Sequence, residues 1–292
     1  LATAANTFTM SNVESVVGGS SDDKITFLTQ ITAGRYDLGG GTVDTLTLGN
    51  FDNTLTAIGV ETIVGNAGAD DITLGNVAAG GSFNLGAGTD VLRLFNGVNN
   101  ITLTNNTITS TSGALNVVLW TDLNTKFAGS RVSISGSTLT TNGGSLWVGG
   151  GALASSLWNG LTVGAAMAIT WTIDTQGIYV GGSNITTGAG SMSFNGLSQY
   201  TGTTAATNMN AGLWIAPGTT LSTTTGSITL KGDVKSKYAS GFGTLIGGWG
   251  TSTGNVTLQT TSGAMDISGT GSDATGTTTG YRSALALVSA GT

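Results

Sequence analysis

A pair of short segments, each alternating between apolar and hydroxyl-bearing residues and joined by a glycine turn, recurs through the second half of this sequence. The clearest copy covers residues 182–196, GSNITTGAGSMSFNG, and related copies begin at Gly136 and Gly218, 46 residues before and 36 residues after Gly182. An alternation of period two is typical of β-strands that bury one face. One copy is too small to bury its apolar side alone, so the copies are expected to stack on one another in a repeat array.

The composition leaves few alternatives to an all-β fold. The 292 residues include 49 glycines and one proline, 39% are hydrophobic and only 8% are charged. The apolar content argues against disorder, the single proline against collagen, and the glycine and β-branched residues against long helices. We therefore expect a right-handed parallel β-helix, or β-solenoid, in which each strand pairs with its counterparts one rung above and below at about 4.8 Å. With about 20 to 26 residues per rung, the chain would form roughly 11 to 14 rungs.

The first hundred residues carry a different version of the repeat. The stretch VESVVG from Val13 matches VETIVG from Val60, and YDLG from Tyr36 matches FNLG from Phe83, both at an offset of 47 residues. This segment holds ten of the fifteen acidic residues and three of the nine basic ones, whereas all six tryptophans follow residue 119. We expect an acidic Gly/Asp-repeat β-solenoid over residues 1–105 and a Thr/Gly-rich β-helix shaft over residues 106–292, continuous with the first.

Two resemblances to known families rest on these repeats. The stretch GNAGADDI from Gly65 and the glycine–aspartate stretches that follow Gly39 and Gly86 resemble the haemolysin-type (RTX) repeats of secreted bacterial proteins, over residues 13–95. Residues 113–292, most clearly SISGSTLTTNGGSL at 133–146, resemble the β-helical shaft of filamentous-haemagglutinin-type exoproteins and autotransporter adhesins. Both resemblances imply secretion or a cell-surface location, and the first also implies calcium.

Four aspartates of the acidic segment are candidate metal ligands: Asp23, Asp44, Asp70 and Asp90. Equivalent positions of successive rungs stack in a β-helix, which would place these carboxylates in one vertical row at a corner. Carboxylates about 5 Å apart repel, so such a row calls for an intervening Ca²⁺ or for hydrogen bonds from backbone amides. The four are separated by 20 or more residues rather than lying in short tandem repeats. The alternative is that each aspartate accepts hydrogen bonds from the backbone of its own turn.

Three aromatic residues, Trp147, Tyr179 and Trp214, each lie between two apolar neighbours. If those neighbours face the core, the aromatic ring faces outward. Tyr179 and Trp214 occupy equivalent repeat positions, so their rings would form a ladder that could bind sugar rings or pack against another rod. The alternative is a covered face, under a loop or a neighbouring layer of strands.

Several functional classes fit the sequence poorly. Cysteine and histidine are absent, which removes disulfides, thiolate chemistry and the commonest general base. The acidic residues after position 100 are scattered, and no serine-elbow or phosphate-loop motif is present, so we do not expect an enzyme. A net charge of −6 and a pI near 4.3 lack the basic surface that nucleic acid requires. No apolar run approaches the roughly 20 residues of a membrane-spanning helix.

We therefore interpret the chain as an extracellular, structural or adhesive segment of a large secreted or cell-surface repeat protein. It would form a rigid rod or filament that associates with copies of itself or with a neighbouring surface, because a nearly uncharged surface removes long-range repulsion. No leader is visible at Leu1-Ala2-Thr3 and the last residues resemble an opening strand, so we expect a piece of something longer, a processed product or an ordered segment of a larger polymer. The alternative function is a carbohydrate-binding adhesin module that uses the aromatic ladder to bind surface glycans.

Overall fold

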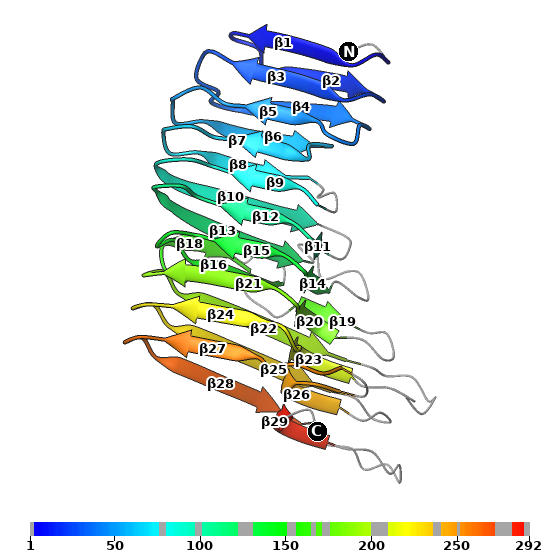
Figure 1. The fold of residues 1–292 in the computed structure, drawn as a ribbon, viewed down its shortest axis with the longest axis vertical. Helices are drawn as coiled ribbons and strands as arrows, with labels where there is room; N and C mark the ends of the chain where they lie inside the picture. Colours follow the sequence, from blue (N-terminus) through cyan, green and yellow to red (C-terminus); the bar gives the residue numbers. More distant parts are fainter. Residues whose placement is uncertain are drawn as a thin grey trace.

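The computed structural model describes residues 3–75, 80–96, 101–121, 131–150, 156–164, 168–170, 176–199, 210–235, 241–249, 252–271 and 282–288. Within these residues the regular structure consists of β-strands, with no helix, as the two-residue alternation predicts. The strands form two long parallel sheets, a shorter third parallel sheet and one antiparallel hairpin (Figure 1). The all-β class and the stacked parallel arrangement expected of a β-solenoid are therefore confirmed.

Sheet 1 contains, in spatial order, β1 (Asn6–Met10), β3 (Asp23–Phe27), β5 (Thr45–Thr47), β7 (Thr62–Val64), β9 (Ser82–Asn84), β12 (Thr107–Thr109), β15 (Thr138–Thr140), β21 (Asn184–Gly188), β24 (Thr220–Thr223) and β27 (Thr257–Thr260). Sheet 2 contains β2 (Ser15–Gly19), β4 (Gly34–Gly39), β6 (Thr54–Ile58), β8 (Asp71–Leu74), β10 (Thr89–Asn96), β13 (Ala114–Thr121), β16 (Leu146–Gly150), β22 (Met192–Ser198), β25 (Ile228–Val234) and β28 (Met265–Thr270). Sheet 3 contains β11 (Ile101–Thr104), β14 (Val132–Ser135), β20 (Gln176–Gly181), β23 (Asn210–Ile215), β26 (Gly241–Gly247) and β29 (Arg282–Val288).

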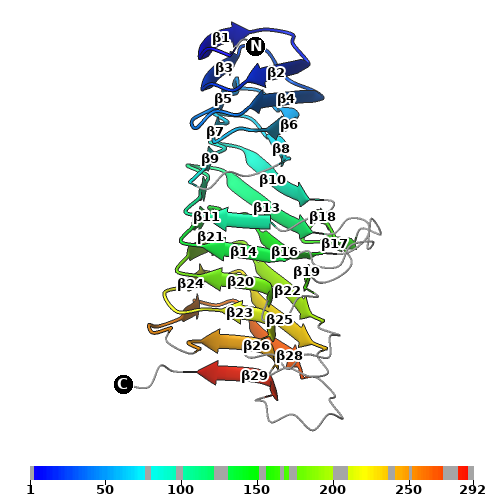
Figure 2. The same cartoon turned by 90° about the vertical axis from the view of Figure 1, so that its right-hand side faces the viewer.

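Each rung of the stack contributes one strand to sheet 1 and one to sheet 2, and from β11 onward also one to sheet 3 (Figure 2). The third sheet therefore begins next to the expected boundary at residues 105 and 106. The hydrophobic core does not stop there, because one cluster of buried side chains extends from Val16 to Ile246. The two parts of the chain share this core.

The rungs differ in length along the chain. Asn6 pairs with Asp23, so the first rung takes 17 residues, and the step from Ser137 to Ser183 takes 46. The step from Ser191 to Ser227 takes 36, so the 46- and 36-residue intervals of the sequence are single rungs. The main path of each long sheet has ten strands in the described residues, fewer than the 11 to 14 rungs that the sequence predicts. The prediction assumed a constant 20 to 26 residues per rung, whereas the later rungs are longer.

The 47-residue repeat of the acidic segment has a different origin. Ile25 lies in β3 of sheet 1, whereas Ile72, its counterpart 47 residues later, lies in β8 of sheet 2. Both side chains point into the core and are essentially inaccessible to solvent. The repeat thus spans two and a half short rungs, which is possible because the two halves of each rung are nearly equivalent.

A Thr/Ser-x-x-Gly turn joins sheet 1 to sheet 2 in the later rungs. The hydroxyl of Thr187 donates a hydrogen bond of 2.6 Å to the carbonyl of Gly190, and the hydroxyl of Thr141 bonds the carbonyl of Gly144 in the same way. A Cβ atom on Gly190 would lie 1.8 Å from the carbonyl oxygen of Gly144 on the preceding rung. Only glycine allows the backbones of successive turns to approach this closely.

The 46-residue rung carries an excursion from the stack. After β16 the chain forms the antiparallel hairpin β17 (Ser156–Trp158) and β18 (Leu161–Val163), whose turn residues Asn159 and Gly160 both have positive φ. The chain then returns as β19 (Ala168–Thr170), which pairs with the second half of β22, while β16 pairs with the first half. Figure 2 shows the hairpin projecting from one side of the rod. No helix of the described residues is long and apolar enough to cross a membrane.

Candidate functional site

A first polar ladder runs along the corner where each rung enters sheet 1. The backbone N–H of Asn6 donates to Oδ1 of Asp23 at 3.0 Å, and the N–H of Asp23 donates to Oδ1 of Asp44 at 2.6 Å. The N–H of Asp44 in turn donates to Oε2 of Glu61 at 2.8 Å. Each side chain therefore satisfies a backbone donor of the equivalent residue on the preceding rung. Later in the chain Ser137 and Ser183 continue the same pattern with hydroxyl oxygens as acceptors.

A second polar ladder lies at the other corner, where the rungs enter sheet 2. Oδ1 of Asp70 accepts hydrogen bonds from the backbone N–H and the side-chain amide of Asn53, at 3.2 and 2.8 Å. Oδ1 of Asp90 accepts one from the N–H of Asp70 at 3.0 Å. Asn53, Asp70 and Asp90 are essentially inaccessible to solvent.

The single vertical row expected for Asp23, Asp44, Asp70 and Asp90 is therefore wrong. Asp23 and Asp44 belong to the first ladder, and Asp70 and Asp90 to the second, because the spacing between Asp44 and Asp70 covers one and a half rungs. Backbone amides do donate to these carboxylates, but the alternative interpretation, which places the donors in the aspartate's own turn, holds only for Asp44. Most of these bonds come from the preceding rung, and only Asp44 also accepts one from its own turn, from the N–H of Gly41.

Burial leaves part of each ladder without a polar partner. Oδ2 of Asp23, Asp70 and Asp90 is buried and has no hydrogen-bond partner within the described residues. Burial raises the pKa of Asp70 from 3.8 to about 7, and it also raises the pKa values of Asp44, Asp90 and Glu61. A buried carboxylate without full compensation favours its neutral, protonated form.

The pKa of an exposed carboxylate beside the first ladder is shifted in the opposite direction. Oδ1 of Asp22 accepts hydrogen bonds from the backbone N–H groups of Thr42 and Val43 and from the Thr42 hydroxyl. The two backbone bonds hold the pKa of Asp22 below its ordinary value. Asp22 and Asp23 are adjacent in sequence, yet one caps an exposed turn as an ion and the other is buried.

The four candidate aspartates do not come together as one set of metal ligands. Ca²⁺ requires six to eight oxygen ligands. In the part of the chain that the structure describes, no three acidic side chains gather closely enough to hold a metal ion. The separation of the ladders also keeps Asp23 and Asp44 away from Asp70 and Asp90. Calcium binding stays a prediction from the sequence.

Trp147 is not part of an exposed aromatic stripe. It points away from the main core, as its apolar neighbours predict, but it lies on sheet 2 and only 4% of its surface is exposed. Leu161 and Val163 of the hairpin cover it, and its ring contacts that of Trp120 edge-on, with 6.4 Å between centroids. The covered face considered as the alternative describes Trp147 correctly.

Tyr179 and Trp214 do form a ladder. They pair across β20 and β23 on the outer face of sheet 3, and their ring centroids are 5.2 Å apart at an interplanar angle of 73°. Both rings are partly exposed. Nε1 of Trp214 donates a hydrogen bond of 2.9 Å to the carbonyl of Gly247, which fixes the orientation of the indole.

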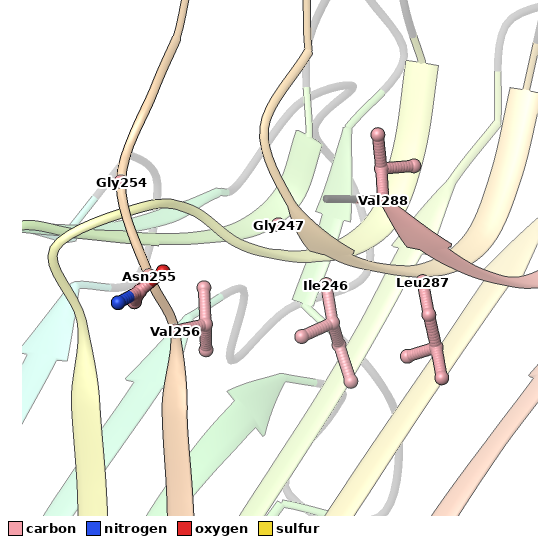
Figure 3. A pocket seen from close by; sticks show the side chains of 7 residues that line it. All are labelled: Ile246, Gly247, Gly254, Asn255, Val256, Leu287 and Val288. Atoms are coloured by element: carbon pink, nitrogen blue, oxygen red, sulfur yellow. The ribbon is translucent and has the colours of Figure 1, made fainter. Parts of the chain in front are cut away.

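A cavity of about 570 Å³ lies where β26 and β29 approach the turn that leads into β27 (Figure 3). Its lining is formed by Ile246, Gly247, Gly254, Asn255, Val256, Leu287 and Val288. Figure 3 shows the side chains of Ile246 and Leu287 pointing in one direction and that of Val288 pointing in the opposite one. None of these seven described lining residues is ionisable.

Sequence reasoning missed a regular feature on the outer face of sheet 1. Because side chains alternate along a strand, each strand places two residues outward on either side of one apolar inward residue. The register joins these residues into two straight files, which we call the outer files. The first file contains Thr7, Lys24, Thr45, Thr62, Ser82, Thr107, Thr138, Asn184, Thr220 and Thr257, and the second contains Thr9, Thr26, Thr47, Val64, Asn84, Thr109, Thr140, Thr186, Ser222 and Gln259. The recurring Thr-x-Thr triplets of the sequence were the available signal.

Comparison of the chain with protein-family models, with curated proteins and with solved structures gave no match. The resemblances to haemolysin-type repeats and to haemagglutinin-type shafts therefore stay predictions from the sequence.

Proposed function

We propose that this chain is a rigid structural or adhesive segment of a large secreted or cell-surface protein, folded as a right-handed parallel β-helix. The observation that carries the proposal is the single uninterrupted stack of ten strands in each long sheet. At about 4.8 Å per step, the first and last strands of such a sheet are roughly 43 Å apart. The right-handed sense follows from the strong preference of parallel crossover connections.

The interactions between rungs support stiffness. The core is continuous, the two ladders join neighbouring rungs by hydrogen bonds in the acidic segment, and threonine hydroxyls of the later turns bond carbonyls of the adjacent rung, as Thr223 bonds Gly188. Bending the rod would have to break several of these contacts at once. The chain surface carries little charge, which favours association with copies of itself or with another surface.

Small-angle scattering and sedimentation of the purified chain test this proposal together. We expect scattering from an elongated particle, and sedimentation that shows association as the concentration rises. A compact particle would contradict the rod, and a clean monomer at high concentration would contradict self-association.

A carbohydrate-binding adhesin module is the second candidate, favoured by the Tyr179–Trp214 pair. Two partly exposed rings in contact, one anchored through its indole N–H, form a firm apolar platform on which a sugar ring could stack. On a glycan array, we expect Trp214→Ala to lose binding while Leu157→Ala on the exposed hairpin keeps it. Equal glycan binding by the two variants would show that the Tyr179–Trp214 pair does not bind the sugar.

A further inference from the structure

The outer files of sheet 1 form a two-dimensional array of threonine side chains. Successive strands of a sheet lie about 4.8 Å apart, and the two outward residues of one strand lie about 6.6 Å apart. Complete Thr-x-Thr ranks occur on β1, β5, β12 and β15, and the residue between the two threonines is apolar in each. In Figure 1 the strands of sheet 1 lie one below another along the rod, so the two outer files follow the rod, and the complete ranks lie between β1 and β15.

The threonines of the outer files differ from those of the turns. Thr141, Thr187 and Thr223 at the corner donate their hydroxyl hydrogens to turn carbonyls and are buried. The outer-file threonines are partly or fully exposed, and within the described residues their hydroxyls form no hydrogen bond with the protein. Each one therefore presents a free hydroxyl beside a methyl group to the surroundings.

Charge distinguishes this face from sheet 2. Lys24 is the one charged residue in the two outer files. The outer face of sheet 2, by contrast, carries Arg35, Asp37, Asp71, Arg93, Lys231 and Asp266. Charged groups hold their own hydration water tightly, whereas hydroxyl and methyl groups in regular order leave the adjacent water free to follow their spacing.

We propose that the outer face of sheet 1 binds ice. The oxygen atoms of hexagonal ice repeat along its two principal axes at spacings close to the two spacings of the threonine array. An ice lattice can therefore meet several neighbouring ranks in register at the same time, such as those of β12 and β15. Individually weak hydroxyl and methyl contacts add up when they engage simultaneously, and they are lost when the geometry forbids it.

The test uses the whole chain, polycrystalline ice and microscopy of single ice crystals just below the melting point. The wild-type chain is expected to partition into growing ice and to shape the crystals. The double variant Thr107→Tyr/Thr138→Tyr, which places two bulky rings in the first outer file, is expected to lose both effects. Matched tyrosine substitutions at Thr102 on sheet 3 and Thr229 on sheet 2 are expected to retain them, with circular dichroism confirming that every variant is folded.

Three outcomes would overturn the proposal. A folded wild-type chain that neither partitions into ice nor shapes it would do so, whether or not the variants fold. Equal loss of ice binding in the control variants would do the same. A chain that ignores ice but forms dimers disrupted by Thr140→Lys would identify the face as an interface between two copies instead.

Discussion

The backbone N–H of Asp70 donates a hydrogen bond to Oδ1 of Asp90, the equivalent residue one rung later. This bond satisfies a buried amide, but the second oxygen of each carboxyl stays buried without a partner among the described residues. In these ladders one carboxyl oxygen accepts a hydrogen bond that stabilises the stack. The other carboxyl oxygen is buried without a partner, which makes ionisation of the group unfavourable.

The first prediction concerns pH. The pKa of Asp70 is raised in the folded chain from 3.8 to about 7, so its contribution to stability is complete below pH 3.8 and declines as the pH rises toward 7. The raised pKa values of Asp44, Asp90 and Glu61 act in the same direction, and the lowered pKa of Asp22 acts in the opposite one. We expect the melting temperature to fall as the pH rises from about 4 to about 8, and Asp70→Asn to flatten that fall.

Thermal melts in a series of buffers across this pH range, with and without added calcium, measure this effect. A wild-type melting temperature that rises steadily with pH would contradict it. A recovery at the alkaline end on adding calcium, absent in Asp70→Asn, would show that a cation and not a proton balances the ladder.

The second prediction concerns the glycine column of the turns. Gly190→Ala would place a Cβ 1.8 Å from the Gly144 carbonyl oxygen, so the stacked turns must move apart. We expect a loss of about 1–3 kcal/mol in the free energy of unfolding, as for other overpacked sites. A Cβ atom on Gly40 would meet open space, so Gly40→Ala should change stability by no more than about 0.5 kcal/mol. Urea unfolding compares the two, and equal effects would exclude the steric explanation.

The third prediction separates two adjacent threonines. Thr187 is buried and its hydroxyl bonds the Gly190 carbonyl, whereas Thr186 lies in the second outer file without such a bond. Thr187→Val keeps the shape but removes this hydrogen bond, and the Gly190 carbonyl then keeps the 3.1 Å bond from the Thr223 hydroxyl, so the cost should be about 0.5–1.5 kcal/mol. Thr186→Val should be close to neutral, within about 0.5 kcal/mol. Chemical denaturation measures both, and a larger cost for Thr186→Val would reverse the assignment of the two side chains.

The fourth prediction concerns the hairpin. Trp147 is buried between Trp120 and the hairpin, so Trp147→Ala should destabilise the chain by about 3–5 kcal/mol. Leu157 is on the same hairpin but 79% exposed, and Leu157→Ala should have little effect. If calorimetry gives similar melting temperatures for both variants, the hairpin does not cover Trp147 in solution.

The sequence predicted the existence of the repeats better than it predicted which sheet each repeated segment joins. Period-two alternation and the 46- and 36-residue spacings suffice for a stacked parallel fold, since each spacing is one rung. The 47-residue offset between Ile25 and Ile72 was harder to interpret, because a repeat of two and a half rungs moves a strand to the other sheet. The error about the aspartate row has the same cause.

The candidate site was less predictable because it depends on what covers each face. Trp147 and Trp214 have similar apolar neighbours, but only Trp147 is followed by a hairpin that folds back over it. The outer files were visible as Thr-x-Thr triplets. They carried no functional signal by themselves, because outward threonines beside inward residues such as Leu46 and Leu139 resemble the ordinary polar surface of any half-buried strand.

The excursion between β16 and β19 has a practical consequence. After the excursion β19 pairs with the second half of β22, and β16 pairs with the first half. The chain therefore leaves the stack and returns to it while both halves of β22 keep a partner strand. The tight turn at Asn159 and Gly160 lies back against the shaft, because Nδ2 of Asn159 donates a hydrogen bond of 3.4 Å to the Ser145 hydroxyl. Both turn residues are exposed, so a peptide epitope grafted beside Gly160 would be accessible to an antibody while the Asn159 contact holds it next to the shaft.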